Sequence, residues 1–308
     1  MREYRLDKKG KLLVSGICLT LLVLLVLWAF PFFVPSGYSV NETVIMNTTV
    51  NITNAAPEIR GNVVLDDPID LVAYGNKTVY CNATVFDWDN DTLTVNATLY
   101  ITGITGPSSS DDGNNHYSVS NCTRLTPQNR EMNYSCNFTM FYWADNSSNW
   151  ECNMTVIDPD GALNSNTSNT AKVNPLVAIY APGIIDYGEL MVNEISGVKL
   201  ANITNAGNRK LNLSVEGWGE TQGDGWAMNC TYGHIDVQYE RYKGTNETWA
   251  NMYELTNESV MIPSFWIDQR TNETAEMYNA TYWRLQIPPF AGGVCNGKIL
   301  FTAQDFVG

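Results

Sequence analysis

The chain has 308 residues and a formal net charge of -14, although only 16% of its residues are charged. This length allows two domains of ordinary size beside a membrane anchor and a linker. Outside the first eleven positions, the basic residues form no patch that would neutralise phosphates. The composition therefore argues against nucleic-acid binding and favours an acidic protein that is hydrated mainly by Asn, Thr and Ser.

A long apolar segment follows a short basic tail. Residues 1–11 carry Arg or Lys at five positions, and the next 23 residues, LLVSGICLTLLVLLVLWAFPFFV, are uncharged and long enough to span a membrane. Because positive charge stays on the cytoplasmic side, we predict a cytoplasmic tail, a transmembrane helix from Leu12 to Val34, and an extracellular remainder. A cleaved signal peptide is the alternative, but no small-residue cleavage site follows the segment.

Twenty Asn-X-Ser/Thr sequons follow the apolar segment, and none precedes it. An Asn- and Thr-rich chain contains such short motifs by chance, but the anchor and the cysteines independently indicate export, so we predict a glycoprotein. Three sequons fall in residues 35–56, which we interpret as a glycosylated linker. The sequon asparagines are Asn41, Asn47, Asn51, Asn76, Asn82, Asn90, Asn96, Asn121, Asn133, Asn137, Asn146, Asn153, Asn166, Asn202, Asn212, Asn229, Asn246, Asn257, Asn272 and Asn279.

Residues 57–174 form the first predicted module. Apolar residues alternate with polar ones in short runs such as TVYCNATVF and TLTVNATLYI, and turn sequences such as DWDND and DPDG separate the runs. This alternation is typical of half-buried strands, and no helical period is sustained beyond the anchor. The pattern predicts an all-β sandwich.

An internal echo refines this prediction. CNATVFDWDN begins at Cys81 and CNMTVIDPDG begins at Cys152, and in a strand each cysteine would point inward while the next Asn points outward. Together with ADNSSNWEC, these segments resemble the B and F strands and the E–F corner of immunoglobulin-like domains, with Trp150 where Tyr is usual. The resemblance implies a disulfide between Cys81 and Cys152. No Trp lies at the antibody distance after Cys81, so no antigen-binding function is carried over.

The remaining cysteines suggest two further disulfides. Cys122 and Cys136 enclose a short segment that we interpret as a hairpin stapled near its tip, although four cysteines allow three pairings. Cys230 would pair with Cys295 by elimination and because both flank strand-like segments. Cys18 lies in the anchor, and no Cys-X-X-Cys pair indicates a zinc ribbon.

Residues 175–308 form the second predicted module. Its opening, IIDYGELMVNEISGVKLANITNAGNRKLNLSV, resembles major-sperm-protein-like surface sandwiches. We expect a strand, a turn, a strand and a hairpin with positive φ at NAGN, then two more strands around a Pro-Pro and Gly-Gly break. The anchor and two Asn-rich modules together resemble a membrane-anchored archaeal cell-surface protein. The positions that match the sandwich pattern are Asp186, Tyr187, Gly188, Asn205, Gly207 and Asn208.

Two constellations deserve weight as binding sites. Acidic residues follow the two echoed strands at matching offsets, so the two turns should lie at one end of the sandwich and offer the oxygen ligands that calcium prefers. The alternative is that both are ordinary turns whose side chains cap local N–H groups. An aromatic platform in the second module is the other candidate, against ordinary core packing. The calcium residues are Asp87, Asp89, Asp91, Asp158 and Asp160, and the aromatic ones are Trp218, Trp226, Trp249, Trp266 and Trp283.

The sequence indicates no enzyme. His116 and His234 are the only histidines, they fall in different modules, and no hydrolase, zinc-protease or P-loop motif occurs. A glycan hydrolase that uses two carboxylates is the enzymatic alternative. We expect instead a cell-membrane glycoprotein for adhesion or recognition of a protein or glycan ligand, with a surface-layer or filament subunit as the structural alternative.

The partner surface should lie where sequons are absent, because a bulky sugar keeps another protein away. Residues 168–201 and 282–308 are the longest such stretches after the anchor. If they form edge strands, their backbone would accept a strand from a partner or from another copy. The sequon-free loop at residues 103–120 is the alternative contact surface.

Overall fold

The computed structural model describes residues 44–274 and 276–307. The predicted cytoplasmic tail, transmembrane helix, Cys18 and Asn41 lie outside these residues. Among the described residues, no helix has the length and apolar character needed to span a bilayer. Residues 44–57, which belong mainly to the predicted linker, contain no strand. The rest is all-β, as the alternation predicts, with only two short 3₁₀ turns, Val237–Tyr239 and Trp249–Asn251.

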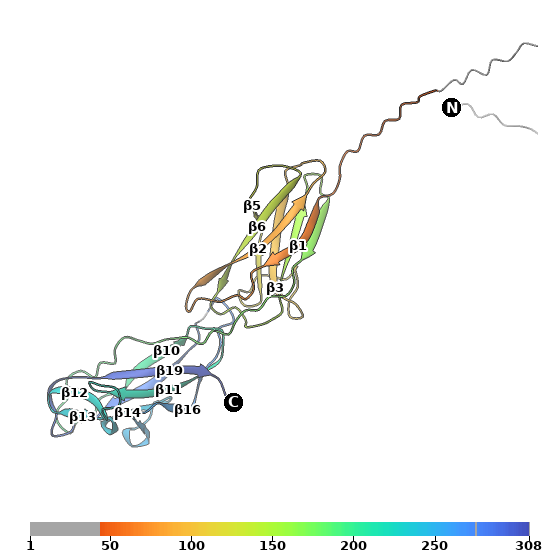
Figure 1. Ribbon diagram of the computed structural model, residues 1–308. Coiled ribbons are helices and arrows are strands. Elements are labelled where there is room, and N and C mark those ends of the chain that lie inside the picture. The colour runs from red at the N-terminus through yellow and green to blue at the C-terminus, as the bar shows by residue number, and fades with distance from the viewer. Residues whose placement is uncertain (1–43, 275, 308) are drawn as a thin grey trace, which may run out of the picture. The chain divides into compact units, whose positions relative to one another are not determined.

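The first module is a sandwich of two antiparallel sheets (Figure 1). One sheet has the order β1-β2-β6-β5 and the other has the order β4-β3-β7-β8. This order is that of an immunoglobulin-like domain, with β2 and β7 in the places of the B and F strands. The strands are β1 (Glu58–Leu65), β2 (Asn76–Phe86), β3 (Thr94–Ile101), β4 (His116–Val119), β5 (Thr123–Arg124), β6 (Glu131–Phe141), β7 (Trp150–Ile157) and β8 (Leu163–Thr167).

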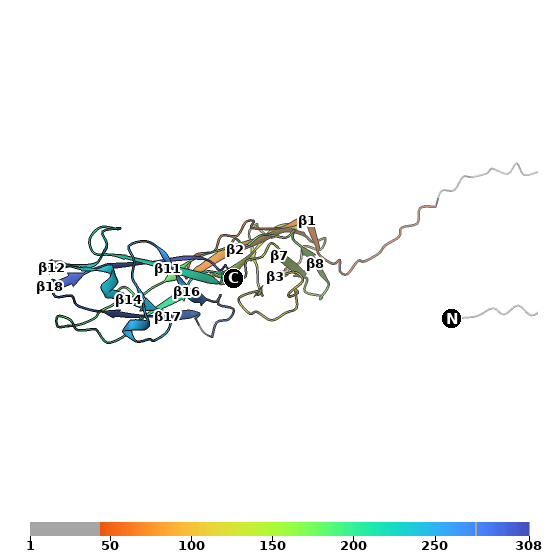
Figure 2. The same cartoon turned by 90° about the horizontal axis from the view of Figure 1, so that it is seen from below.

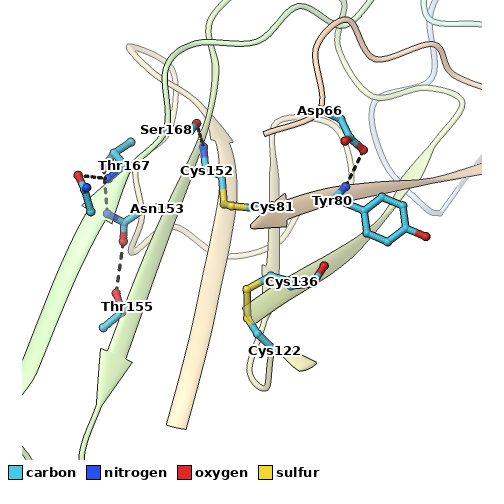
Figure 3. Close-up of a disulfide and its surroundings, with 12 residues drawn as sticks. Asp66, Tyr80, Cys81, Cys122, Cys136, Cys152, Asn153, Thr155, Thr167 and Ser168 are labelled. Carbon is cyan, nitrogen blue, oxygen red and sulfur yellow. Dashed lines mark hydrogen bonds between the residues drawn. A yellow bond between two sulfur atoms is a disulfide. The ribbon is translucent and has the colours of Figure 1, made fainter. Parts of the chain in front are cut away.

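Strict alternation in β2 and β7 fills the core of this module. Cys81 and Cys152 are fully buried and form a disulfide that joins the two sheets. Figure 3 shows the two sulfur atoms between the layers, while Asn153 lies on the other side of β7 and donates a hydrogen bond to Thr167 Oγ1 at 3.0 Å. Each sequon asparagine beside a core cysteine therefore lies on the outer face of its sheet.

The E–F corner forms as the resemblance implies. Trp150 is fully buried, and its indole Nε1 donates a hydrogen bond to the carbonyl oxygen of Asp145 at 3.0 Å. A tyrosine hydroxyl makes the equivalent bond in immunoglobulin domains. The Trp side chain thus holds the corner and also contributes one of the largest buried surfaces of the core, where each such side chain stabilises the fold by about 2 to 3 kcal/mol.

The second disulfide has the expected partners. Cys122 and Cys136 are joined, and Thr123 pairs with Ser135 in the β5–β6 ladder. The bond closes the open end of a short hairpin, and because β5 is only two residues long, the turn begins shortly after Cys122.

The second module is also a two-layered β structure, whose layers can be followed in Figure 2. A five-stranded sheet has the order β15-β14-β17-β10-β9, and two three-stranded sheets have the orders β16-β11-β19 and β13-β12-β18. The strands are β9 (Ile179–Tyr180), β10 (Lys199–Asn205), β11 (Leu211–Trp218), β12 (Trp226–Tyr232), β13 (His234–Asp236), β14 (Glu240–Lys243), β15 (Tyr253–Glu254), β16 (Val260–Ile267), β17 (Tyr278–Leu285), β18 (Gly292–Asn296) and β19 (Lys298–Asp305).

The third disulfide staples one edge of this module. Cys230 of β12 and Cys295 of β18 are bonded, and they are direct partners in the antiparallel ladder. Unlike the Cys81–Cys152 bond, which joins the two sheets of the first module, this disulfide joins neighbouring strands of one sheet. Its half-buried sulfur atoms lie beside the core that Trp283, Leu213 and Ile203 fill.

Two expectations for the opening of the second module were wrong. Residues 184–198 form no strand, because Pro182 and Gly183 end β9 and Gly188 takes a positive φ of 75°. NAGN is not a hairpin either, since β10 and β11 belong to different sheets and none of its four residues has positive φ. Gly207 is needed for another reason: a Cβ there would lie 2.0 Å from the carbonyl oxygen of Leu176.

Residues Ile52–Gly308 form one compact unit with two separate hydrophobic cores. Hydrogen bonds from side chains and from the backbone link the two modules near residue 174. Asn208 is fully buried, and its Nδ2 donates to the carbonyl oxygens of Ala144 and Asn174. The backbone N–H of Tyr74 donates to the carbonyl oxygen of Ala206 at 3.1 Å. The start of β2 therefore faces the second module.

The structure sorts the sequons by accessibility. Eighteen of the nineteen described sequon asparagines are exposed or half-exposed, and Asn212 is the exception at 8% exposure. Asn212 lies in β11 between β16 and β19, and its Nδ2 donates to the carbonyl oxygen of Val307. We expect glycopeptide mass spectrometry to find Asn212 unmodified and Asn202 of the neighbouring sequon modified. A glycan at Asn212 in folded protein would contradict its burial.

Candidate functional site

The acidic turns follow β2 and β7, and each is shaped by a buried carboxylate. Asp87 is fully buried, and its Oδ2 accepts the backbone N–H of Asp91 at 2.6 Å. Asp158 is 5% exposed, and its Oδ1 accepts the N–H of Ala162 at 2.8 Å. One oxygen of each carboxylate thus caps its own turn, as the turn interpretation requires.

The structure brings the two turns together. Burial raises the pKa of Asp91, and the negative charges of Asp87, Asp89, Asp160 and Asp158 raise it further. Four other carboxylates therefore lie close enough to disfavour the charged form of Asp91. The disulfide between β2 and β7 fixes this arrangement, because both strands run toward the same end of the sandwich and the turns follow at matching offsets.

Two residues of the linker also bind the acidic turns. Asn54 Nδ2 donates to Asp158 Oδ2 at 3.0 Å, and this bond is the main cause that lowers the pKa of Asp158. The backbone N–H of Ala55 donates to Asp89 Oδ2 at 2.5 Å. Sequence analysis missed Asn54, although its place just before Pro57 and the first strand is a usable signal. The linker therefore ends as an ordered part of the acidic cluster.

Two oxygen atoms of this cluster lack partners. Asp87 Oδ1 and Asn54 Oδ1 are buried, and neither accepts a hydrogen bond from a residue that the structure describes. Leaving such an atom unpaired costs about 1 to 3 kcal/mol, and more for a charged group. Among the described residues, no three His, Cys, Asp or Glu side chains are already arranged around one point as metal ligands. The donor set nevertheless suits a hard cation such as calcium, which takes carboxylate and amide oxygens in flexible geometry.

A separate cavity of about 980 Å³ lies in the second module. The strandless segment of residues 181–192 forms one wall, and Ala201 of β10, Leu285 of β17 and Phe301 of β19 contribute to the others. Glu240 also lines the cavity although it is only 1% exposed, and it accepts the Tyr187 hydroxyl at 2.6 Å. Burial raises the pKa of Glu240 to about 7.

The tryptophans of the second module form no common platform. Trp283 is fully buried against Tyr242 in the core. Trp226 stacks on His234, Trp249 lies over Arg241, and Trp266 is 43% exposed beside Lys210. The core-packing interpretation therefore holds for Trp283, while Trp226 and Trp266 lie in different strands and Trp249 lies in a 3₁₀ turn.

Neither histidine lies in a catalytic arrangement within the part of the chain that the structure describes. His116 is buried, and its Nδ1 lies 2.8 Å from Asp111 Oδ1. His234 belongs to β13 of the other module, where its Nε2 lies 3.3 Å from Asp236 Oδ1.

No family model matches the chain, and no curated protein matches it. The solved structures that resemble it include three at low identity. A DUF4466 family protein from Parabacteroides merdae is 9% identical with a TM-score of 0.21, and the alignment covers 75% of this chain and 97% of that one. A chaperone–tip adhesin complex of CFA/I fimbriae is 8% identical with a TM-score of 0.28 and 80% coverage of both chains. A marsupial T cell receptor is 11% identical with a TM-score of 0.23, covering 81% of this chain and 64% of that one.

Proposed function

We propose that the protein is a single-pass, glycosylated surface protein that acts in adhesion or recognition at the cell envelope, without catalysis. The observation that carries this proposal is the pairing of a core disulfide with outward sequons on the same two strands. Cys81 and Cys152 are bonded, while the next residues, Asn82 and Asn153, lie on the outer faces. Disulfides persist and Asn-linked sugars attach outside the cytosol, which agrees with the orientation expected from the basic tail. The sequence resemblance to archaeal surface proteins supports an archaeal envelope as part of this proposal.

Protease treatment of intact cells tests the location. The modules should be digested while a tag at the N-terminus is spared, because the tail stays inside. Loss of the tag together with the modules would overturn the proposed topology. Saturable micromolar binding to a member of a glycan or protein panel would then support recognition, and turnover of a polysaccharide would instead support the hydrolase alternative.

The structural alternative, a subunit of a surface layer or filament, is favoured by one observation. β19 pairs with β11 on one side only, and residues 199–203 of β10 pair only with β17, among the described residues. Such free edges accept strands from other chains. A regular array on purified membranes would favour this alternative over recognition.

We further propose that the acidic cluster of the first module binds calcium. The buried, unpaired Asp87 Oδ1 and the mutual repulsion of the five carboxylates support this proposal, because a divalent cation would satisfy both. Asn54 would add an amide oxygen. Since Asn54 and Ala55 already bind the turns, calcium would also fasten the end of the linker to the module.

Calcium should therefore stabilise the protein. Extracellular modules bind calcium with dissociation constants of roughly 0.1 to 1 mM, so about 10 mM calcium should add on the order of 1 to 3 kcal/mol to the free energy of unfolding. We expect a rise of a few degrees in the melting temperature. Asp87→Asn combined with Asp158→Asn should abolish the rise.

Glu131→Gln is the matched control, because it removes an exposed negative charge of β6 in the same module. This variant should keep the full calcium response. An unchanged melting temperature of the native protein, measured up to about 10 mM calcium, would leave turn capping as the better interpretation.

A further inference from the structure

The cavity of the second module opens beside an unpaired strand edge. β19 has a ladder partner, β11, on one side, and no backbone hydrogen bond within the described residues joins its other side to residues 181–192. Along β19, Ile299 and Phe301 are half-buried and line the cavity, as does the exposed Lys298 at the start of the strand, whereas Leu300 is exposed and lies outside the lining. An added strand at this edge would continue the sheet and place alternate side chains over the cavity.

Part of the wall of this groove is apolar. Ala201, Leu285 and Met228 lie in or against the core, and Val294 at the rim is 70% exposed. Charged residues also line the cavity: Asp186, Glu189 and Lys298 belong to its lining, and Glu240 accepts the Tyr187 hydroxyl. An uncharged strand in the groove would gain from burial of its apolar side chains against the core residues and from backbone hydrogen bonds to β19.

The linker contains a segment with matching chemistry. In residues 44–52, VIMNTTVNI, four of the five apolar side chains, Val44, Met46, Val50 and Ile52, fall at alternate positions with Thr48 between them, and Ile45 falls on the other face. Each of the four is at least 71% exposed. The sequon asparagines Asn47 and Asn51 fall on the opposite face of such a strand, where their glycans would point away from a groove.

A strand in this groove must come from another molecule. Ile52 is two residues from Asn54, whose side chain binds Asp158 beyond the end of β2. The start of β2 faces the second module through the bond of Tyr74 to Ala206. β2 has eleven residues, so it separates the two places by about 35 Å, which two residues cannot bridge.

We propose that residues 44–52 of one copy bind as an added strand along β19 of a second copy, with Met46 and Val50 over the groove. This proposal deepens the structural alternative of the proposed function by naming the contact through which copies would assemble. The two surfaces differ, so the contact is heterologous, and repetition joins copies head to tail into an open chain.

A synthetic peptide of residues 43–53, TVIMNTTVNIT, tests the proposal on the full glycosylated chain purified in detergent. Fluorescence anisotropy should show saturable binding. Met46→Asp with Val50→Asp in the peptide should weaken binding by at least about tenfold, because both substitutions place a charge over the groove. Ile45→Asp with Thr49→Asp is the matched control on the other face and should bind within about threefold of the original peptide.

Variants of the groove provide the second arm. Ile299→Glu should abolish peptide binding, whereas Leu300→Glu on the other face of β19 should retain it. If Ile299→Glu fails to fold, Val294→Glu provides the test instead. The Val294 side chain is 70% exposed at the rim of the groove, so a charge there does not disturb the core. Sedimentation of the same full-length variants should show loss of head-to-tail assembly with the groove changes and with Met46→Asp and Val50→Asp.

Three outcomes would overturn the inference. In the first, the peptide does not bind. In the second, the Met46→Asp with Val50→Asp peptide and the Ile45→Asp with Thr49→Asp peptide lose the same affinity. In the third, the groove variants abolish assembly but the changes in residues 44–52 do not. The last would assign the groove to a different occupant. These outcomes are independent of the protease experiment on intact cells. An inverted topology would contradict the proposed surface role, but it would not change binding between purified molecules.

Discussion

Replacing both Cys81 and Cys152 by Ala should lower the free energy of unfolding of the first module by about 4 kcal/mol or more. The bond closes a loop with a sequence separation of 71, and loop-closure entropy alone accounts for about 4 kcal/mol at this length. Both side chains are fully buried between the sheets, so the lost sulfur contacts add to the effect. Urea unfolding of the glycosylated protein, followed by tryptophan fluorescence, measures the change.

The Cys122–Cys136 bond is the matched comparison within the same module. Its sequence separation is only 14, which corresponds to about 3 kcal/mol. Removing it should therefore destabilise the module less and leave the sandwich folded. Equal losses for the two double variants would contradict the view that the bond between β2 and β7 holds the layers together.

Strand alternation and the cysteine echo made the first module predictable. Asn82 and Asn153 could be placed on the outer faces from the sequence, because side-chain direction in a strand follows directly from position. The same logic placed the acidic turns at one end. What a strand pattern cannot show is which side chain of a preceding segment folds back, and Asn54 was missed for that reason.

The second module was less predictable because its decisive contacts are nonlocal. Residues 184–198 contain several apolar residues that suit a strand, yet the burial of Tyr187 against Glu240 holds them as an irregular wall. The two residues are 53 positions apart, so no local pattern reveals their bond. Asn205 likewise fixes the NAGN connection by donating to the carbonyl oxygens of Arg209 and Asp268, one of which lies in a distant turn.

A glycan introduced into the sequon-free stretches can probe the partner surface at Lys298 but not at Lys199. A sequon at Lys199 requires Ser or Thr at position 201, but Ala201 is fully buried in the core. A sequon at Lys298 requires Thr at position 300, where Leu300 is 40% exposed and points away from the core. Only the second probe adds a glycan without disturbing the fold.

The burial of Glu240 should make the second module pH-sensitive. Burial raises its pKa from 4.5 to about 7, although the hydrogen bond from Tyr187 opposes this shift. The folded state therefore holds a proton between pH 4.5 and about 7 that the unfolded chain has released. This contribution to stability is fully present below pH 4.5 and is lost as the pH rises through about 7.

Glu240→Gln should remove this dependence, because Gln stays neutral and its side-chain oxygen still accepts the Tyr187 hydroxyl. At pH 8 the variant should be more stable than the native protein by about 3 kcal/mol, since each pKa unit corresponds to about 1.4 kcal/mol. At pH 4.5 the two proteins should unfold at nearly the same urea concentration. The measurement is the difference in free energy of unfolding between them from pH 4.5 to 8.5.

Glu258→Gln is the control for the loss of one carboxyl group in the same module, because Glu258 is exposed in a turn. Its difference from the native protein should stay small and nearly constant over the same pH range. A constant difference for Glu240→Gln as well would mean that Glu240 titrates near its ordinary pKa and that solvent reaches it through the cavity. A difference that grows through pH 7 would instead show that the carboxyl group between Tyr187 and the groove is held neutral at low pH.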